Sequence, residues 1–159
     1  MVRFAFLSGL MIMAGAGLAW AGDIAADQAW ARIAPGGTTG AVFVTLRNGG
    51  ATDALIGAAT DIATRAALHG HRMDGDIARM RPVDRIALPA NSDTKLAPGG
   101  NHVMLFDLAR KLTEGERFSL TLSFEHSAPV TVEVTVVGLG KTPDGENSGH
   151  DNHGGHSDH

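Results

Sequence analysis

The stretch "RFSLTLSFEHSAPVTVEVTVVG", from Arg117 to Gly138, alternates apolar and polar residues in two runs that a short polar segment separates. Successive side chains of a β-strand point to opposite faces, so each run predicts a strand with one buried face. The run "AVFVTLRN", from Ala41 to Asn48, shows the same alternation. These three segments indicate a fold built on half-buried strands.

Shorter runs of the same kind occupy most of the remaining chain. The further strand candidates are residues 28–33, 55–59, 65–72, 77–81, 85–88, 94–96 and 102–108. Turn signals such as "APGGTTG", "MDGD" and "APGGN" separate them, and no segment has the period of an amphipathic helix. Many short strands with closely spaced turns predict an all-β domain over residues 22–140, either a β-sandwich or a Greek-key barrel.

The first 21 residues have the features of an export signal. Arg3 supplies a positive charge, an apolar run follows, and Ala19-Trp20-Ala21 places small residues around a cleavage point after Ala21. An uncleaved membrane anchor is the alternative, but the apolar run barely reaches spanning length. We therefore expect a signal peptide over residues 1–21 and a mature protein in the periplasm of a Gram-negative type of cell.

Charge and cysteine content exclude several functions. The chain of 159 residues suits one domain and carries a net charge of −4, with both signs scattered along it. This balance argues against nucleic acid or an anionic membrane as a partner, and a monomer is expected. Because the sequence has no cysteine, it has no disulfide, no thiol exchange and no thiolate metal site. A metal site would have to use histidine, methionine or carboxylate ligands.

The composition changes after Gly140. Residues 141–159 contain no apolar residue larger than proline, so a disordered tail is expected there. Half of the eight histidines occur in this segment at every third position, namely His150, His153, His156 and His159. Their interleaving with Asp, Asn, Gly and Ser differs from the unbroken run of a purification tag. A His-rich tract of this kind predicts metal collection, with Cu(II) as the expected ion and zinc as an open alternative.

The other histidines and the methionines of the mature chain gather in one region. His102 and Met104 are two apart at the start of a strand candidate, directly after "PGG", so both side chains point to one face. His69, His71 and Met73 repeat this spacing, and Met80 lies in the next strand candidate. Thioether sulfur is a soft ligand that suits Cu(I), while imidazole accepts either copper oxidation state. The cluster therefore favours a carrier of monovalent copper.

The spacing His69-x10-Met80-x21-His102-x-Met104 is similar to the H-x10-M-x21-H-x-M pattern of the PCuAC family of periplasmic copper chaperones. The stretches "AWARIAPGGTTGAVFVTLRN", "MDGDIARMRPV" and "LAPGGNHVMLFDLARKLTEGERFSLTLSFE" also resemble that family. The resemblance implies a cupredoxin-like Greek-key β-sandwich that binds Cu(I) through these four residues. It also implies delivery to the CuA centre in subunit II of cytochrome c oxidase, beside a Sco-type thiol protein, with tails that take Cu(II) in some members.

The remaining candidates receive smaller roles. His71 is an auxiliary ligand or an entry point, with a solvent-facing side chain as the alternative. Met73 is expected to be a packing residue, His126 has no expected metal role, and Trp30 belongs to the core or packs near the site. Without a G-x-S-x-G or H-E-x-x-H motif, no enzyme and no catalytic residue is expected. A copper-buffering or resistance protein, a zinc carrier and a structural β-sandwich stay open as alternatives.

Overall fold

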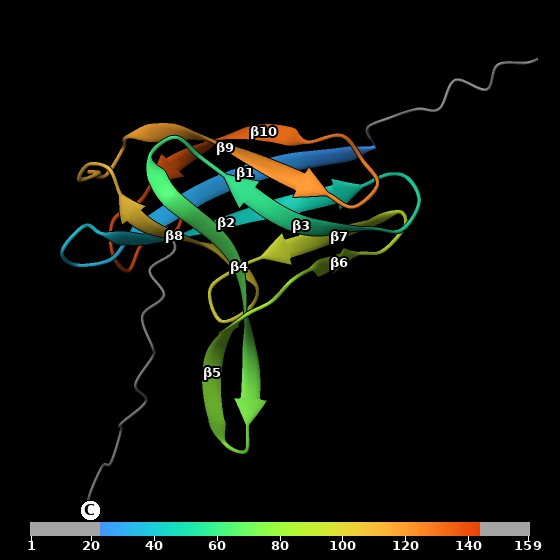
Figure 1. Cartoon of the computed structure of the whole chain (residues 1–159), viewed down its shortest axis with the longest axis horizontal. Helices are drawn as coiled ribbons and strands as arrows, with labels where there is room; N and C mark the ends of the chain where they lie inside the picture. The colour runs from blue at the N-terminus through green and yellow to red at the C-terminus, as the bar shows by residue number, and fades with distance from the viewer. Residues whose placement is uncertain (1–22, 144–159) are drawn as a thin grey trace, which may run out of the picture.

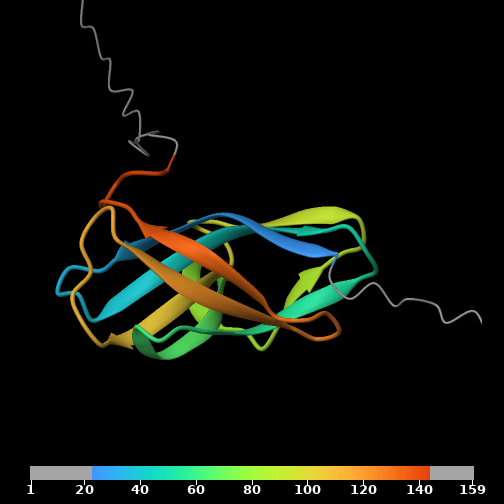
Figure 2. The same cartoon turned by 90° about the horizontal axis from the view of Figure 1, so that it is seen from above.

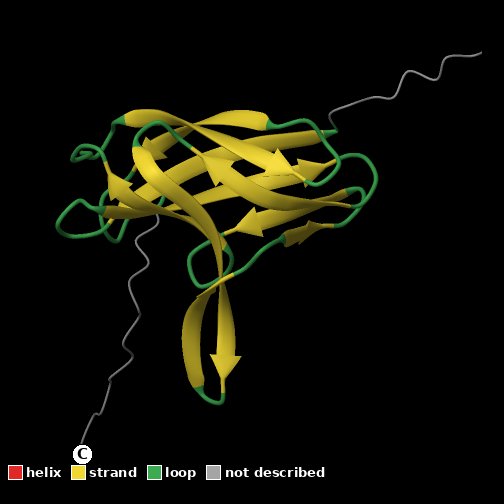
Figure 3. Ribbon diagram, in the orientation of Figure 1, coloured by secondary structure: helices red, strands yellow, loops and turns green. Residues whose placement is uncertain are grey.

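The computed structural model describes residues 23–143. The predicted signal peptide, the predicted cleavage point and the four tail histidines lie outside the described residues. Figure 3 shows that the described part consists of strands joined by loops, with no helix. In particular, residues 23–143 contain no helix long and apolar enough to cross a membrane.

Ten strands make up the described part, and each corresponds to a segment predicted from the sequence. They are β1 (Ile24–Ile33), β2 (Thr39–Asn48), β3 (Asp53–Ala59), β4 (Ala63–Asp74), β5 (Ile77–Pro82), β6 (Ile86–Leu88), β7 (Ser92–Leu96), β8 (His102–Leu108), β9 (Arg117–Phe124) and β10 (Val130–Val136). The ends differ most at β1, which begins four residues before the predicted strand, and at β4, which is longer at both ends.

The strands form one ladder in the order β5-β4-β8-β2-β1-β10-β9-β3-β6, with β7 paired to β2 (Figure 1). Within this ladder only β1–β2, β4–β5 and β9–β10 are neighbours both in space and in sequence. The other pairs need crossing connections, as in a Greek key. β1 and β10 run parallel, which places the first and last described strands side by side. The predicted all-β Greek-key fold is confirmed.

The ladder folds over a single apolar core. Phe118, Leu120, Leu122 and Phe124 alternate along β9 and point inward, as the pattern in the sequence predicts. They belong to the same buried cluster as inward residues of β2 and β8, which lie on the other side of β1 and β10 in the ladder. Two layers therefore face each other across the core, and Figure 2 shows β9 and β10 (orange) crossing in front of β2 (cyan).

The β4–β5 hairpin extends away from this body (Figure 1). β8 pairs with β4 only as far as the His69–His102 pair, and the rest of β4 pairs with β5 alone. At the free end, Met73 is 65% exposed and Met80 is 56% exposed. The expectation that Met73 packs is therefore wrong, because the hairpin reaches beyond the layer that would have covered its side chain.

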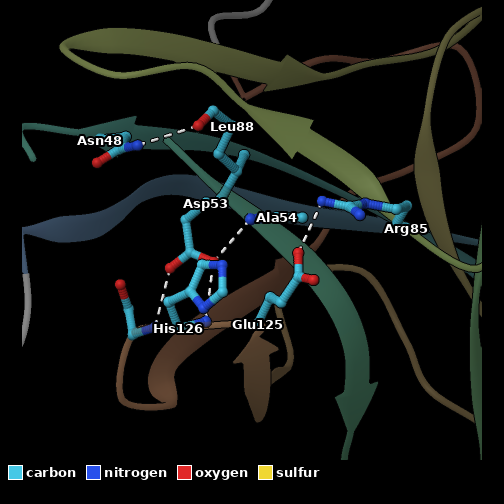
Figure 4. A network of polar contacts seen from close by, with 8 residues as sticks. Asn48, Asp53, Ala54, Arg85, Leu88, Glu125 and His126 are labelled. Atoms are coloured by element: carbon cyan, nitrogen blue, oxygen red, sulfur yellow. Dashed lines mark hydrogen bonds and ion pairs between the residues drawn. The ribbon is translucent and has the colours of Figure 1, made fainter. Parts of the chain in front are cut away.

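A polar network ties the start of β3 to the turn between β9 and β10 (Figure 4). The Asp53 carboxylate accepts hydrogen bonds from the backbone N–H groups of His126, at 3.0 Å, and Ser127, at 2.9 Å. It also accepts one from the Ala54 N–H at 2.7 Å. Burial raises the pKa of Asp53, but a hydrogen bond from the Ser127 side chain and these three backbone hydrogen bonds outweigh it and bring the pKa to about 2. In this network His126 acts through its backbone.

Candidate metal centre

The face of β4, β5 and β8 that points away from the core gathers most of the imidazole and thioether groups. His69 lies directly opposite His102, and Met104 lies opposite Ala67. On the other side of β4, Met80 lies opposite His71. Directly paired residues project to the same side of a sheet, so all of these side chains share one face. We call it the His/Met face; its candidate ligands are His69, His71, Met80, His102 and Met104, and Met73 lies farther out on the same side of the hairpin.

Strand alternation explains why this face is separate from the core. Along β8, Val103 and Leu105 are fully buried among the core residues, while His102 and Met104 point to the opposite side. In the "HVML" sequence, residues suited to metal binding therefore alternate with residues that pack in the core. The structure thus brings the four predicted ligands to one face, and it adds His71 to them.

The spacing between the imidazoles is compatible with a shared ion. The ring centroid of His102 lies 6.0 Å from that of His69 and 6.0 Å from that of His71. With metal–nitrogen bonds of about 2 Å, two imidazoles on one ion have ring centres roughly 5 to 6.5 Å apart. Among residues 23–143, no three His, Asp or Glu side chains are arranged to hold a metal ion by themselves. The register nevertheless places two methionine thioethers beside these imidazoles as further soft donors.

The histidine rings are held through their Nδ1 atoms. The carbonyl of Gly100 accepts from His102 Nδ1 at 3.0 Å and from His71 Nδ1 at 3.3 Å. His69 Nδ1 points at the carbonyl of Ala67 at 3.4 Å. A carbonyl only accepts, so each of these contacts requires the proton on Nδ1. The Nε2 lone pairs of His71 and His102 are then available to a metal ion.

The turn before β8 explains the "PGG" sequence. Gly99 has a φ of +82°, a conformation that glycine adopts without the penalty that a Cβ brings. The N–H of Gly100 donates to the Ala97 carbonyl at 2.9 Å and closes the turn. This geometry aims the Gly100 carbonyl at the two histidine rings. The turn and the face are therefore one local unit.

His102 is the most deeply placed member of the face, with only 3% of its surface exposed. Burial lowers its pKa, the hydrogen bond to Gly100 opposes this effect, and the nearby His69 and His71 lower the pKa further. The net direction is downward, which favours the neutral ring. A neutral imidazole keeps its lone pair for metal binding in weakly acidic solution.

Aromatic side chains border the two central histidines. Phe43 lies 6.0 Å from the His102 ring and 4.5 Å from Trp30, centroid to centroid. Phe106 lies 5.8 Å from the His69 ring. Trp30 therefore packs near the site, as one of the two expectations had it. Phe43 and Phe106 are not among the residues predicted from the sequence. Both occupy outward positions of their strands, and an aromatic residue at a position that alternation turns away from the core is the signal that could have found them.

Comparison with known protein families and sequences gives two matches. Residues 24–136 match the family described as "Putative lipoprotein LpqE-like". The protein "Putative lipoprotein Lxx21020" of Leifsonia xyli subsp. xyli is 31% identical over 117 residues, which cover 73% of this chain and 70% of that protein.

Solved structures give matches over a similar span. The copper-bound PCuAC domain from PmoF2 is 27% identical with a TM-score of 0.63, and the match covers 74% of this chain and 95% of that one. Cu(I)-bound DR1885 from Deinococcus radiodurans is 30% identical with a TM-score of 0.55, covering 78% of this chain and 83% of that one. These matches confirm both the fold and the resemblance found in the sequence.

Proposed function

Since this chain belongs to the LpqE-like family, a family of PCuAC type, we propose that it is a copper chaperone of the cell envelope. The observation that carries the proposal is the placement of two thioethers and two imidazoles on one side of β4, β5 and β8. The copper-bound PCuAC domain from PmoF2 and Cu(I)-bound DR1885, which are 27% and 30% identical to this chain, support the choice of metal. The export signal predicted over residues 1–21 and the lipoprotein names of the relatives support the location.

The proposed Cu(I) ligands are His69, Met80, His102 and Met104. Soft, neutral thioethers and imidazoles suit a monovalent copper ion, and the outward positions of β4, β5 and β8 carry no carboxylate that would favour a harder ion. Met80 is largely exposed on the hairpin, so it is the ligand that can leave first when copper is given away. His71 is proposed as an auxiliary ligand at the exposed edge.

Delivery is proposed to follow ligand exchange. An acceptor with cysteine thiolates binds Cu(I) better than thioethers do, so transfer to such a protein is downhill. The proposed acceptor is the CuA centre in subunit II of cytochrome c oxidase, reached directly or beside a Sco-type thiol protein. The tail histidines are proposed to collect Cu(II). Its reduction to Cu(I) needs an external donor, because this sequence has no thiol.

The ligand set is tested by replacing both proposed thioethers. The double variant Met80→Leu, Met104→Leu nearly conserves side-chain volume, so the fold should persist. We expect its Cu(I) affinity, measured by competition with a colorimetric chelator, to fall by at least about tenfold, or about 1.4 kcal/mol. Met73→Leu is the matched control, since it makes the same chemical change on the same hairpin. Equal affinities in all three proteins would exclude the thioether site.

Two further measurements separate the open alternatives. X-ray absorption on the Cu(I)-loaded protein truncated after residue 143 should count two sulfur and two nitrogen scatterers. Transfer of Cu(I) to an apo fragment of oxidase subunit II distinguishes a chaperone from a copper-buffering protein, which would retain its copper. Tighter binding of Zn²⁺ than of either copper ion would favour a zinc carrier instead.

A further inference from the structure

A groove runs beside the site along the outer side of β1 and has a volume of about 860 Å³. One wall is the segment after β10, from Lys141 to Pro143, where the described residues end. Lys95, near the end of β7, and Pro98, at the start of the β7–β8 turn, also line the groove, as does Trp30. We call this feature the C-terminal groove, because the chain enters residues 144–159 from its rim.

The point of entry is fixed. Arg32 on β1 donates two hydrogen bonds to the carbonyl of Lys141, at 3.2 Å from Nε and 2.7 Å from Nη2. The Lys141 ammonium pairs with Glu114 at 2.8 Å. The guanidinium of Arg32 also lies 5.0 Å above the Trp30 ring. The segment that carries the tail is therefore held against the same β1 side chains that line the groove.

The other end of the groove borders the His/Met face. Pro98 begins the turn whose Gly100 carbonyl holds His71 and His102. On the groove floor, Trp30 contacts Phe43, which lies next to His102. Neighbouring strands are about 4.8 Å apart, so β1 and β4, which carries His71 and is separated from β1 by β2 and β8, are about 14 Å apart. Nine residues from Thr142 to His150 can span up to about 30 Å, which exceeds what this path requires.

Charge also matches between the groove and the tail. The first tail residues include Asp144 and Glu146, and the groove wall carries Lys95. Lys95 is exposed and makes no ion pair within residues 23–143. The other charged lining residues, Glu114 and Lys141, pair with each other, so Lys95 is the available cation that an acidic segment entering the groove would meet.

We propose that residues 144–150 occupy the C-terminal groove and bring His150 to the exposed edge of the His/Met face at His71. There Cu(II) held by the tail passes to the His71 imidazole by exchange of one imidazole for another, and its later reduction to Cu(I) still needs the external donor. The transfer step rests on the proposed function, whereas the docking of the tail does not. Docking of the tail in the groove thereby makes the transfer of the metal from the tail to the His/Met face an intramolecular step.

The docking is tested without metal, using the chain from residue 22 onward, in which Trp30 is the only tryptophan. We expect the Trp30 indole N–H and the Gly99 and Gly100 amides to shift in NMR spectra between chains 22–159 and 22–143. The variant Lys95→Glu in chain 22–159 should lose these shifts. Lys111→Glu, the same charge change on an exposed lysine outside the groove, should retain them.

Superimposable groove signals in the long and short chains would overturn the docking. So would shifts that survive both Lys95→Glu and the double change Asp144→Asn, Glu146→Gln. The relay is tested separately by stopped-flow mixing with one equivalent of Cu(II), and the phase of Trp30 quenching that the variant His71→Ala loses is the readout of copper reaching the face. Slower quenching in Lys95→Glu than in Lys111→Glu supports the relay, and equal rates exclude it. Docking without any copper binding would instead contradict the proposed function and leave the groove assignment standing.

Discussion

Gly100 is the residue that connects a backbone turn to the metal-facing side chains. Its carbonyl accepts from both His71 and His102, so a single backbone group sets the orientation of two imidazoles. A metal site gains affinity when its ligands are already oriented before the ion arrives. The position of this carbonyl depends on the left-handed conformation of Gly99, which precedes it.

Replacing Gly99 with alanine should therefore weaken the site through the backbone. A Cβ at Gly99 meets nothing within 4 Å, so the strain comes from the φ of +82° and should cost about 1 to 2 kcal/mol of stability. We also expect weaker Cu(I) binding in the chelator competition, because the Gly100 carbonyl shifts.

Gly36→Ala is the control for this change. Gly36 has a φ of +99°, equally open surroundings and a place in the β1–β2 turn. It should lose similar stability in urea denaturation and keep its copper affinity. If the two variants bind Cu(I) equally well, the turn does not orient the ligands.

The β4–β5 hairpin shows what strand patterns in the sequence can and cannot predict. Alternation located both strands, and the same-face spacing of His69 and His71 held in the structure. Alternation could not reveal that β4 extends beyond the end of β8, so a packing role was predicted for the apolar Met73 although its side chain is exposed. The cross-strand pairing of Met80 with His71 also depends on the turn at Asp74–Ile77, and no local pattern specifies that register.

β1 gives a second example at the scale of an element. Its pairing with β2 shifts between Asp27 and Trp30, and Gln28 has a φ of +52°. This bulge changes the phase of the strand, so Ile24 and Ala31 both reach the core although their numbers differ in parity. A strict period of two therefore misses the first part of β1. The order of the strands in the ladder could not be predicted from the sequence either, because most neighbouring strands are far apart along the chain.

At the scale of the whole molecule, polar contacts near the β6 end of the ladder hold strands and turns together without using the metal-bearing strands. Asp53 begins β3, near the β6 edge, and its carboxylate binds the turn that joins β9 to β10. Asn48 adds to this corner, since its amide donates to the Leu88 carbonyl of β6 at 3.1 Å (Figure 4). The corner lies away from the His/Met face, so stability and metal binding can be varied separately.

The pH dependence of folding should report on this corner. Because the pKa of Asp53 falls from 3.8 to about 2 on folding, its ionised form stabilises the native state above about pH 4. That contribution to the free energy of unfolding, about 2 kcal/mol by linkage, should be lost as the pH falls from about 4 to about 2.

Asp53→Asn should remove most of this pH dependence and lower the free energy of unfolding at pH 7, measured by urea denaturation. Asp93→Asn, an exposed aspartate on β7, should keep the wild-type profile. Identical acid profiles for wild type and Asp53→Asn would mean that other carboxylates govern acid unfolding. The Cu(I) affinity at pH 7 should be unchanged in both variants, because neither residue touches the His/Met face.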